Sequence, residues 1–303
     1  MGFTKILALL ILLALCVAVG ILLPAHWQIQ RIEPDLPSAT EFRSLGEASD
    51  RPIRVSYLHS AEQPRGGRLL GHGAFLAEWA DGRMFMIDAS MDEKAAKDFG
   101  ALMRLIGDAG QDLFHGSVSK LLGSALNRVE GVGLTHLHID HSQGLTDFCG
   151  SRSTASPARV YQTPWQAEEV NLHTSEGAEI VRSSCLQPTL ASREGMFLLP
   201  DFPGLGMVAL GGHTPGSTLF AIAGPDRIWL IAGDTTNIKS HIPEDRPKAL
   251  TYSYLMVPEN TARTSQLRSW LAALDAEQDF RVLVSHDVED IRSSGMPEFR
   301  GPR

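Results

Sequence analysis

The hydrophobic pattern of the chain begins with one long apolar segment. Residues 6–23 are apolar throughout, apart from Gly20, and a single lysine, Lys5, precedes them. Eighteen residues in a helix extend about 27 Å, close to the thickness of the hydrocarbon core of a bilayer. Residues 1–23 are therefore predicted to be a membrane anchor or a signal segment. An uncleaved anchor is preferred, because a signal peptide usually has a shorter apolar core.

Short apolar runs follow after residues 24–52, which contain prolines and charged residues without periodicity and are predicted to be a linker. Alternation of period two predicts strands at 53–59, 74–79, 83–88, 131–135, 207–210, 217–223, 227–232 and 280–284. Asp81-Gly82 predicts a hairpin turn between the second and third of these. Helical spacing predicts helices at 92–106, 117–129 and 262–276, and another beginning near 164.

This order of elements predicts one α+β domain over residues 53–303. Strands come first, helices lie between them, and strands and a helix return at the end. Such an order is typical of two mixed sheets with helices on the outside. Hydrophobic residues make up 43% of the 303, which is enough for a sizeable core.

The net charge limits the expected binding partners, and the cysteines bear on the cellular compartment. The net charge is −8 and there is no run of lysine or arginine, so nucleic acid is not an expected partner. A small-molecule substrate is expected instead, and the oligomeric state stays open. Cys149 and Cys185 either pair in an oxidising compartment or remain free thiols, because two cysteines without a spacing motif do not decide between these states.

The strongest chemical signal is a group of metal-binding side chains at residues 135–141. Four side chains within six residues can bind a metal: His136, His138, Asp140 and His141. They follow a β-prone run, and on a strand His136 and His138 point to the same side. A turn after that strand frees Asp140 and His141 to reach a second position nearby. Imidazole suits zinc, iron or nickel, and a carboxylate adds neutralising charge.

Three more candidate ligands come from distant parts of the sequence. His213 lies in the turn Gly-Gly-His-Thr-Pro-Gly-Ser at 211–217, while Asp234 and His286 each follow an apolar strand. Ligands at the ends of buried strands are held rigidly, as a catalytic metal site requires. We therefore expect these residues to complete the site.

The motifs together resemble the metallo-β-lactamase superfamily over roughly residues 53–290. The resemblance rests on the order His-x-His-x-Asp-His, Gly-His-Thr-Pro-Gly-Ser, Gly-Asp and Ser-His-Asp. It implies a four-layer αββα sandwich with two divalent ions at one edge of the sheets, zinc being preferred over iron or manganese. By resemblance, one ion has the ligands His136, His138 and His213, the other has Asp140, His141 and His286, and Asp234 bridges them.

The resemblance also implies the reaction. Two divalent ions lower the pKa of a bridging water, so that hydroxide forms near neutral pH and attacks the substrate. Asp140 and Asp234 are the expected catalytic residues, with Asp140 orienting the nucleophile or passing its proton to the leaving group. The expected reaction is cleavage of an ester, lactone or thioester bond in a small, amphiphilic substrate.

Several members of the superfamily remain open. The full ligand set resembles quorum-signal lactonases, glyoxalase II, phosphodiesterases and alkylsulfatases, whereas antibiotic-degrading β-lactamases generally lack the bridging aspartate. The tyrosine expected in lactonases three residues after that aspartate is Asn237 here, and few residues follow His286, where glyoxalase II has a helical domain. An iron-dependent persulfide dioxygenase and a metal-binding protein without turnover are the alternatives from other classes.

Candidate substrate-binding residues and the location complete the prediction. His241 and the stretch 251–256, with Tyr252 and Tyr254, either form a lid over the metals or pack in the core, and Asn237 is a candidate hydrogen-bond donor to the substrate. His72 either lines the mouth of the site or is a surface histidine. Lys5 before the apolar segment favours a catalytic domain outside the cytoplasm, in a bacterial periplasm. Secretion after cleavage of the segment is the alternative.

Overall fold

Two β-sheets packed face to face form the centre of the computed structural model, which describes residues 3–107, 109–153, 155 and 157–301. Within these residues, the larger sheet has seven strands in the order β4-β1-β2-β3-β5-β6-β7, and the smaller has five in the order β12-β11-β10-β9-β8. The strands of the larger sheet are β1 (Arg54–Arg65), β2 (Arg68–Glu78), β3 (Met84–Ile87), β4 (Leu113–Phe114), β5 (Val129–Gly133), β6 (Arg159–Gln162) and β7 (Gln187–Leu190). Those of the smaller sheet are β8 (Met196–Leu198), β9 (Leu205–Ala209), β10 (Thr218–Ala223), β11 (Ile228–Ile231) and β12 (Phe280–Leu283).

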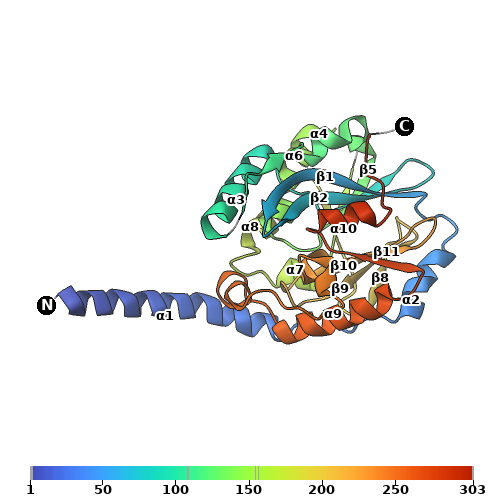
Figure 1. Cartoon of the computed structure of the whole chain (residues 1–303). Helices are drawn as coiled ribbons and strands as arrows, with labels where there is room; N and C mark the ends of the chain where they lie inside the picture. The colour runs from blue at the N-terminus through green and yellow to red at the C-terminus, as the bar shows by residue number, and fades with distance from the viewer. Residues whose placement is uncertain (1–2, 108, 154, 156, 302–303) are drawn as a thin grey trace.

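Helices cover the outer face of each sheet (Figure 1). Apolar residues of α4 (Val118–Leu122), α6 (Leu145–Ser151) and α8 (Ser175–Ser183) pack in one cluster with the larger sheet. On the other side, α9 (Thr261–Asp275) and α2 (Ala39–Arg43) pack on the smaller sheet. The layers therefore follow the order αββα, as predicted. The remaining helices are α3 (Glu93–Ile106), α5 (Ile139–Ser142), α7 (Pro164–Glu168), α10 (Val288–Ser293) and the short helices η1 (Ser44–Glu47), η2 (Gly123–Arg128), η3 (Gly233–Thr235), η4 (Lys239–His241) and η5 (Tyr252–Met256).

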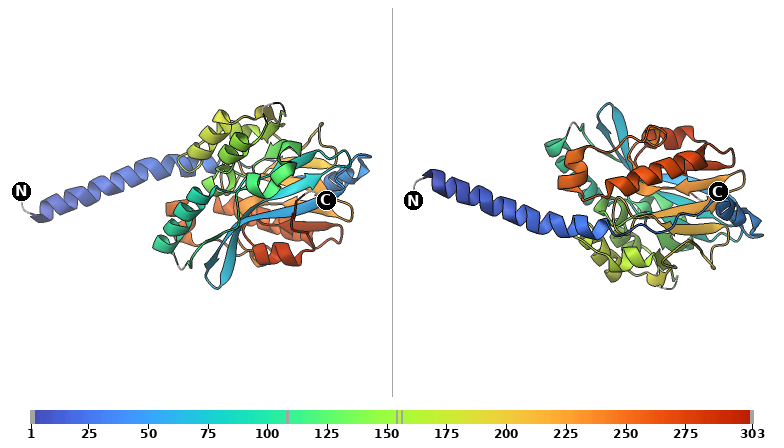
Figure 2. Two further views of the ribbon diagram at one scale, coloured as in Figure 1. Left: turned by 90° about the horizontal axis from the view of Figure 1, so that it is seen from above. Right: turned by 90° about the horizontal axis from the view of Figure 1, so that it is seen from below.

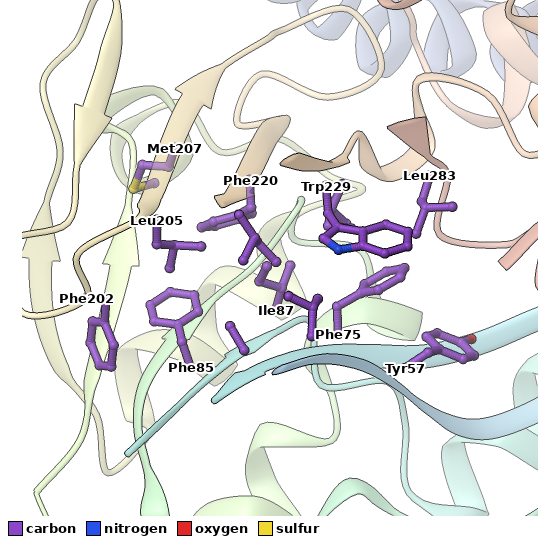
Figure 3. Packing of buried hydrophobic residues seen from close by; sticks show 14 of the residues in the cluster. Tyr57, Phe75, Phe85, Ile87, Phe202, Leu205, Met207, Phe220, Trp229 and Leu283 are labelled. Atoms are coloured by element: carbon purple, nitrogen blue, oxygen red, sulfur yellow. The ribbon is translucent and has the colours of Figure 1, made fainter. Parts of the chain in front are cut away.

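The core between the sheets follows from the alternation of the strands (Figure 3). Tyr57 and Phe75 of the larger sheet meet Phe220, Trp229 and Leu283 of the smaller one in one buried cluster. Alternate residues of the same strands point to the outer face and join the helices there. Because both faces of the sheets are buried, the strands β3 and β11 in their interior are apolar throughout.

Strand direction brings the predicted ligands to one edge. β3 and β5 are parallel neighbours in the larger sheet, and β11 and β12 are parallel neighbours in the smaller one. β9 runs in the same direction as β11, because β10 lies antiparallel between them. Parallel strands have their carboxyl ends at the same edge, so the loops that follow them meet there.

The N-terminal segment forms α1 (Phe3–Ile29), which continues beyond the apolar run (Figure 1, Figure 2). Its last turns belong to the domain: Ala25 and Ile29 are buried, and His26 Nε2 donates a hydrogen bond to the carbonyl oxygen of Tyr254 at 3.0 Å. In the part of the chain that the structure describes, no helix combines the length and the apolar content needed to cross a bilayer. The prediction of a membrane-spanning helix over residues 1–23 is therefore not supported.

Residues 24–52 differ from the predicted linker, because they contain helices that pack on the domain. Phe42 of α2 and Leu45 of η1 are buried against the outer face of the smaller sheet. The helix α2 begins with a capping box, in which the Glu41 amide donates to Ser38 Oγ and the Ser38 amide donates to Glu41 Oε2. That Ser-x-x-Glu pattern is a sequence signal of a helix start.

Other elements differ from prediction in detail. The α-helix expected over 117–129 ends at Leu122, because Gly123 has a φ of +54°, and the chain continues as the 3₁₀-helix η2. β2 begins at Arg68, six residues before the predicted strand, because Gly71 and Gly73 obscure its alternation. Cys149 and Cys185 form a disulfide, with Cα atoms 5.5 Å apart, so the paired state is the one found.

Candidate metal centre

All seven predicted ligands lie together at the edge where the strands end, and all but His138 are buried. His136 and His138 are in the loop after β5, Asp140 and His141 are in the first turn of α5, and Asp234 and His286 follow β11 and β12. His213 lies between β9 and β10, after Gly211 and Gly212, whose φ angles of +66° and +81° favour glycine. The seven candidate ligands are His136, His138, Asp140, His141, His213, Asp234 and His286.

The first group consists of His136, His138 and His213. One ligand atom of each lies within 4.8 Å of the others. His136 Nε2 and His138 Nδ1 are 3.0 Å apart, and the ring centroids of His138 and His213 are 4.9 Å apart with the planes nearly perpendicular. Three imidazole nitrogens thus converge on one point, as in a three-histidine metal site.

The second group consists of Asp140, His141 and His286. Asp140 Oδ2 is 3.4 Å from His286 Nε2 and 3.7 Å from His141 Nε2. The Nε2 atoms of His141 and His286 are 3.3 Å apart. This group supplies one carboxylate and two imidazoles to a second point.

Asp234 lies between the two groups. Its Oδ2 is 3.1 Å from His286 Nε2 and 3.8 Å from His213 Nε2, and its Oδ1 is 3.6 Å from His141 Nε2. A single carboxylate therefore reaches a histidine of each group. That position is the one a bridging ligand needs.

The hydrogen bonds of the histidines fit a cation. His141 Nδ1 donates to Asp88 Oδ2 at 2.9 Å, and His286 Nδ1 donates to the Gly71 carbonyl oxygen at 2.7 Å. The Nε2 atoms of these two rings then face each other at 3.3 Å. Within the described part of the chain, His138 Nε2, His213 Nε2 and Asp234 Oδ1 are buried without a hydrogen-bond partner. Buried polar atoms without partners are rare, and a metal ion satisfies these together.

The pKa shifts of the site also indicate a place for a cation. Burial favours a neutral ring at His141, but Asp88, Asp140 and Asp234 outweigh it and raise its pKa to about 10. Burial also disfavours the charged form of Asp140, yet His141, His72 and His286 hold the pKa of its carboxyl well below the usual value. Burial, followed by neighbouring histidines, lowers the pKa of His136 and His138, which keeps both rings neutral and able to bind a metal. The site is thus built for positive charge.

Supporting residues behind the ligands were not predicted from the sequence. Asp88, directly after β3, accepts hydrogen bonds from the Thr135 amide at 2.7 Å and from His141. Glu259 accepts from His213 Nδ1 at 2.6 Å, and Lys248 donates to Glu259 at 3.0 Å and to the Asp234 carbonyl oxygen at 2.8 Å. Such carboxylates orient metal-binding histidines. Asp88 carried a usable signal, a polar residue at a strand end, whereas Glu259 and Lys248 carried none.

A cavity of about 600 Å³ adjoins the second group and is lined by part of the predicted lid. Asn237, His241 and Tyr252 line it, together with His286. Tyr254 lies outside its lining and stacks on His26, with ring centroids 5.4 Å apart. His72 is buried, with 4% of its surface exposed, and lies beside Asp140 rather than at the surface.

The model of the metallo-β-lactamase superfamily matches residues 68–286, which is more than half of the chain. The chain belongs to the metallo-β-lactamase superfamily. Among proteins with curated functions, none matches the chain in sequence. The superfamily match spans every ligand described above, from the strand that carries His72 to His286.

Solved structures share the metallo-β-lactamase fold at low sequence identity. One is an N-acyl homoserine lactone hydrolase with the product N-hexanoyl-L-homoserine bound at its catalytic metal centre; it is 16% identical, has a TM-score of 0.59, and the match covers 80% of this chain and 96% of that one. A quorum-quenching N-acyl homoserine lactone lactonase is 15% identical with a TM-score of 0.58, covering 80% and 96%. A probable metal-dependent hydrolase from Staphylococcus aureus is 17% identical with a TM-score of 0.54, covering 79% and 91%. At these identities the likeness concerns the fold.

Proposed function

We propose that this protein is a dinuclear metallohydrolase that cleaves an ester, lactone or thioester bond of a small, amphiphilic substrate. The observation that carries the proposal is the convergence of two ligand groups on one shared carboxylate, Asp234, beside a cavity. The superfamily match and the lactonases of the same fold support it. Two zinc ions are the proposed metals, with iron or manganese as the alternatives.

The proposed chemistry divides between the metals and the chain. Bound divalent ions supply Lewis-acid polarisation of the substrate and acidify water near neutral pH. The chain holds the ligands rigidly, because each follows a buried strand or lies in a short turn. Asp140 lies at the centre of the second group, where its carboxylate can accept a proton from the nucleophile and return it to the leaving group.

The lining of the cavity supports an amphiphilic substrate. Leu69, Leu70 and Ile238 offer apolar contacts for an acyl chain, and the ring of Tyr252 lies parallel to that of His213, with centroids 6.5 Å apart. Polar and charged side chains line the rest of the cavity, so that apolar and polar parts of one substrate would both find partners. Tyr252 therefore connects the predicted lid with the first ligand group.

A second candidate function is hydrolysis of a phosphodiester or a sulfate ester. It is favoured by the cationic side chains of the same cavity, to which Arg65, Arg68, Arg246 and Lys248 contribute. Arginine binds phosphate and sulfate groups well because its planar guanidinium makes paired hydrogen bonds. The same residues would also bind a carboxylate at the far end of an ester or lactone.

A substrate panel tests both candidates. The full chain, loaded with zinc or manganese, is assayed with acyl homoserine lactones, aryl esters, thioesters, phosphodiesters and sulfate esters, with Asp140→Ala as control. We expect turnover of a lactone, ester or thioester, reduced on the order of 100-fold or more in the control, as for loss of an acid–base group. Turnover of the phosphodiester or sulfate ester alone would support the second candidate.

The panel also addresses the other classes. Turnover that survives in Asp140→Ala would contradict the role proposed for that carboxylate. Metal-loaded protein without turnover of any bond class would overturn the hydrolase proposal, and would favour an iron-dependent persulfide dioxygenase or a metal-binding protein without turnover. Oxygen consumption with a persulfide substrate distinguishes these two.

We propose that the domain works outside the cytoplasm, such as in a bacterial periplasm. The Cys149–Cys185 disulfide supports this location, because disulfides persist mainly in oxidising compartments. Alkylation of free thiols in fractionated cells tests it. The pair is expected to resist alkylation until a reductant is added, in material from the periplasm or the medium.

A further inference from the structure

His72 occupies an unusual place in the larger sheet, because it is a polar residue fixed in a strand beside the metal centre. It lies in β2 between Gly71 and Gly73 and is paired with Ala61 of β1. The backbone of Gly71 is tied to His286 twice: its amide donates to the His286 carbonyl oxygen at 3.0 Å, and its carbonyl accepts from His286 Nδ1 at 2.7 Å. The position of His72 is therefore set by the same hydrogen bonds that hold a predicted ligand.

The side chain of His72 points into the second ligand group. Its Nδ1 lies 3.4 Å from Asp140 Oδ2, and its ring centroid is 4.9 Å from that of His286, with the planes at 70°. A ligand atom of each of these three residues lies within 4.8 Å of the others. The edge contact with Phe99, at a centroid distance of 5.1 Å, confines the ring on another side.

Among the residues that the structure describes, neither nitrogen of this buried ring has a hydrogen-bond partner, although Asp140 Oδ2 lies 3.4 Å from Nδ1. An unpaired polar group in the interior destabilises a protein by about 1–3 kcal/mol, so native structures usually provide a partner. Elsewhere in the centre, His141, His213 and His286 each use Nδ1 for a carboxylate or a carbonyl and keep Nε2 for the metal. His72 has no such arrangement, and both of its nitrogens remain available.

We propose that His72 is an additional protein ligand of the second metal position. This inference rests on the dinuclear centre proposed above. Together with Asp140 and His286 it forms a set of two imidazoles and one carboxylate, and His141 and Asp234 bring the protein donors at this position to five. Tetrahedral zinc sites use four ligands, so five donors would favour at this position the alternative metals named above, Fe²⁺ or Mn²⁺, which accept a higher coordination number. The first position, with three histidines and Asp234, matches zinc.

Metal binding to the metal-free full chain tests the proposal without any assay of turnover. The wild type, His72→Ala and His72→Asp are titrated with Co²⁺, Mn²⁺ and Zn²⁺, following heat, bound metal and the visible absorption of Co²⁺. We expect His72→Ala to bind one ion as the wild type does and the second at least 10-fold more weakly, and to lose part of the Co²⁺ absorption. His72→Asp, which keeps a donor, is expected to bind the second ion more tightly than His72→Ala.

His59→Asn is the matched control, because His59 is also a buried histidine of the β1–β2 hairpin but clusters with Glu62 and His115, apart from the two ligand groups that share Asp234. It should bind both ions as the wild type does. Second-ion affinity and Co²⁺ absorption in both His72 variants identical to those of the wild type would overturn the proposal. The hydrolase proposal fails separately, if protein that binds two ions cleaves no substrate of the panel.

Discussion

At the scale of single residues, the candidate metal ligands depend on the side chains that hydrogen-bond to them. Glu259 is buried, and it binds His213 Nδ1, Lys248 and Ser253. Burial alone would raise its pKa, but Lys248 and His213 lower the pKa of this carboxyl to about 2. It is therefore charged under all ordinary conditions, and it fixes the tautomer of His213 that leaves Nε2 free.

Replacing Glu259 by Gln is expected to weaken metal binding at the first position by about 10–100-fold, the usual effect of removing the partner of a histidine ligand. The amide removes the negative charge that pairs with Lys248 while keeping the size of the side chain. Titration of the metal-free variant with Zn²⁺ measures the change. Glu277→Gln, at an exposed glutamate that pairs with Arg43, is the control and should bind like the wild type.

His59 predicts a pH dependence of stability that is separate from the metal centre. Burial, and then the charges of His115 and Arg292, lower its pKa from 6.5 to about 4. The titratable or charged side chains around it are Tyr57, Glu62, His72, His115 and Arg292. Its Nε2 donates to the Ala61 carbonyl oxygen at 3.1 Å and its Nδ1 accepts from the Arg292 guanidinium at 3.1 Å, so the neutral ring is the form that packs.

Because the unfolded chain takes up the proton near pH 6.5 and the folded chain only near pH 4, stability is lost as the pH falls between these values. The loss for the whole interval is on the order of 3 kcal/mol, at 1.36 kcal/mol for each pKa unit. Urea unfolding of metal-free protein at several pH values measures it. In His59→Asn, the loss of unfolding free energy between pH 6.5 and pH 4 should be smaller by about this amount. The control His26→Asn should show the same loss as the wild type. A loss in His59→Asn equal to that of the wild type would contradict the assignment to His59.

At the scale of elements, the positions of the ligands depend on how closely the two sheets approach. Gly133 is the last residue of β5 and lies two residues before Thr135 and three before His136, the first candidate ligand. A Cβ atom at this glycine would lie 2.2 Å from the ring of Phe220 in β10. The loop that carries His136 and His138 therefore starts from a strand pressed directly against the opposite sheet.

Gly133→Ala is expected to destabilise the protein by about 1–3 kcal/mol, as overfilled cores do. The free energy of unfolding in urea measures this change. Gly150→Ala in α6 is the matched control, since a Cβ there has no atom within 4 Å, and it should not destabilise. Equal stability of the two variants would show that the sheets separate easily at β5.

The elements also show which parts of the site the sequence could predict. Asp234 and His286 were predictable because each ends an apolar strand, and the 135–141 group because four donors lie so close together. His72 was not, because its role depends on a hairpin that begins earlier than the pattern indicates and on contact with Asp140, 68 positions along the chain. Glu259 reaches His213 only through the packing of the loop before α9, which no local periodicity encodes.

At the scale of the whole molecule, the centre joins the two sheets. The larger sheet and its loops supply His136, His138, Asp140 and His141, whereas His213, Asp234 and His286 follow strands of the smaller one. An ion bound to ligands from both sheets binds the folded protein and not the separated sheets. Metal therefore stabilises the fold in proportion to its affinity and concentration.

Removing the metal with a chelator is expected to lower the melting temperature and the free energy of unfolding. With an ion present at 100 times its dissociation constant, the difference is about 2.7 kcal/mol for each site. Calorimetry of the metal-free and reloaded full chain measures it. Asp234→Ala should lose most of this difference, because it removes the carboxylate shared by both groups. Equal melting temperatures with and without metal would contradict a centre that connects the sheets.

The disulfide stabilises a different part of the molecule. It links Cys149 in α6 to Cys185, two residues before the edge strand β7, and closes a loop with a sequence separation of 36. A crosslink over such a loop stabilises by about 2–4 kcal/mol, chiefly by restricting the unfolded chain. The double variant Cys149→Ser, Cys185→Ser is therefore expected to unfold at lower urea concentration and yet to bind both metal ions, because no ligand lies in the loop that it opens.

Cys16→Ser is the control for this prediction, because Cys16 is exposed and unpaired. It should unfold like the wild type, and a reductant should lower the stability of both to that of the double variant. If the double variant also lost the second ion, the loop between the two cysteines would have to position α5, where Asp140 and His141 lie, and not only to restrict the unfolded chain. If instead it matched the wild type in stability, the edge of the larger sheet would be held by packing of α6 and α8 alone, through Phe148, Ala178 and Val181.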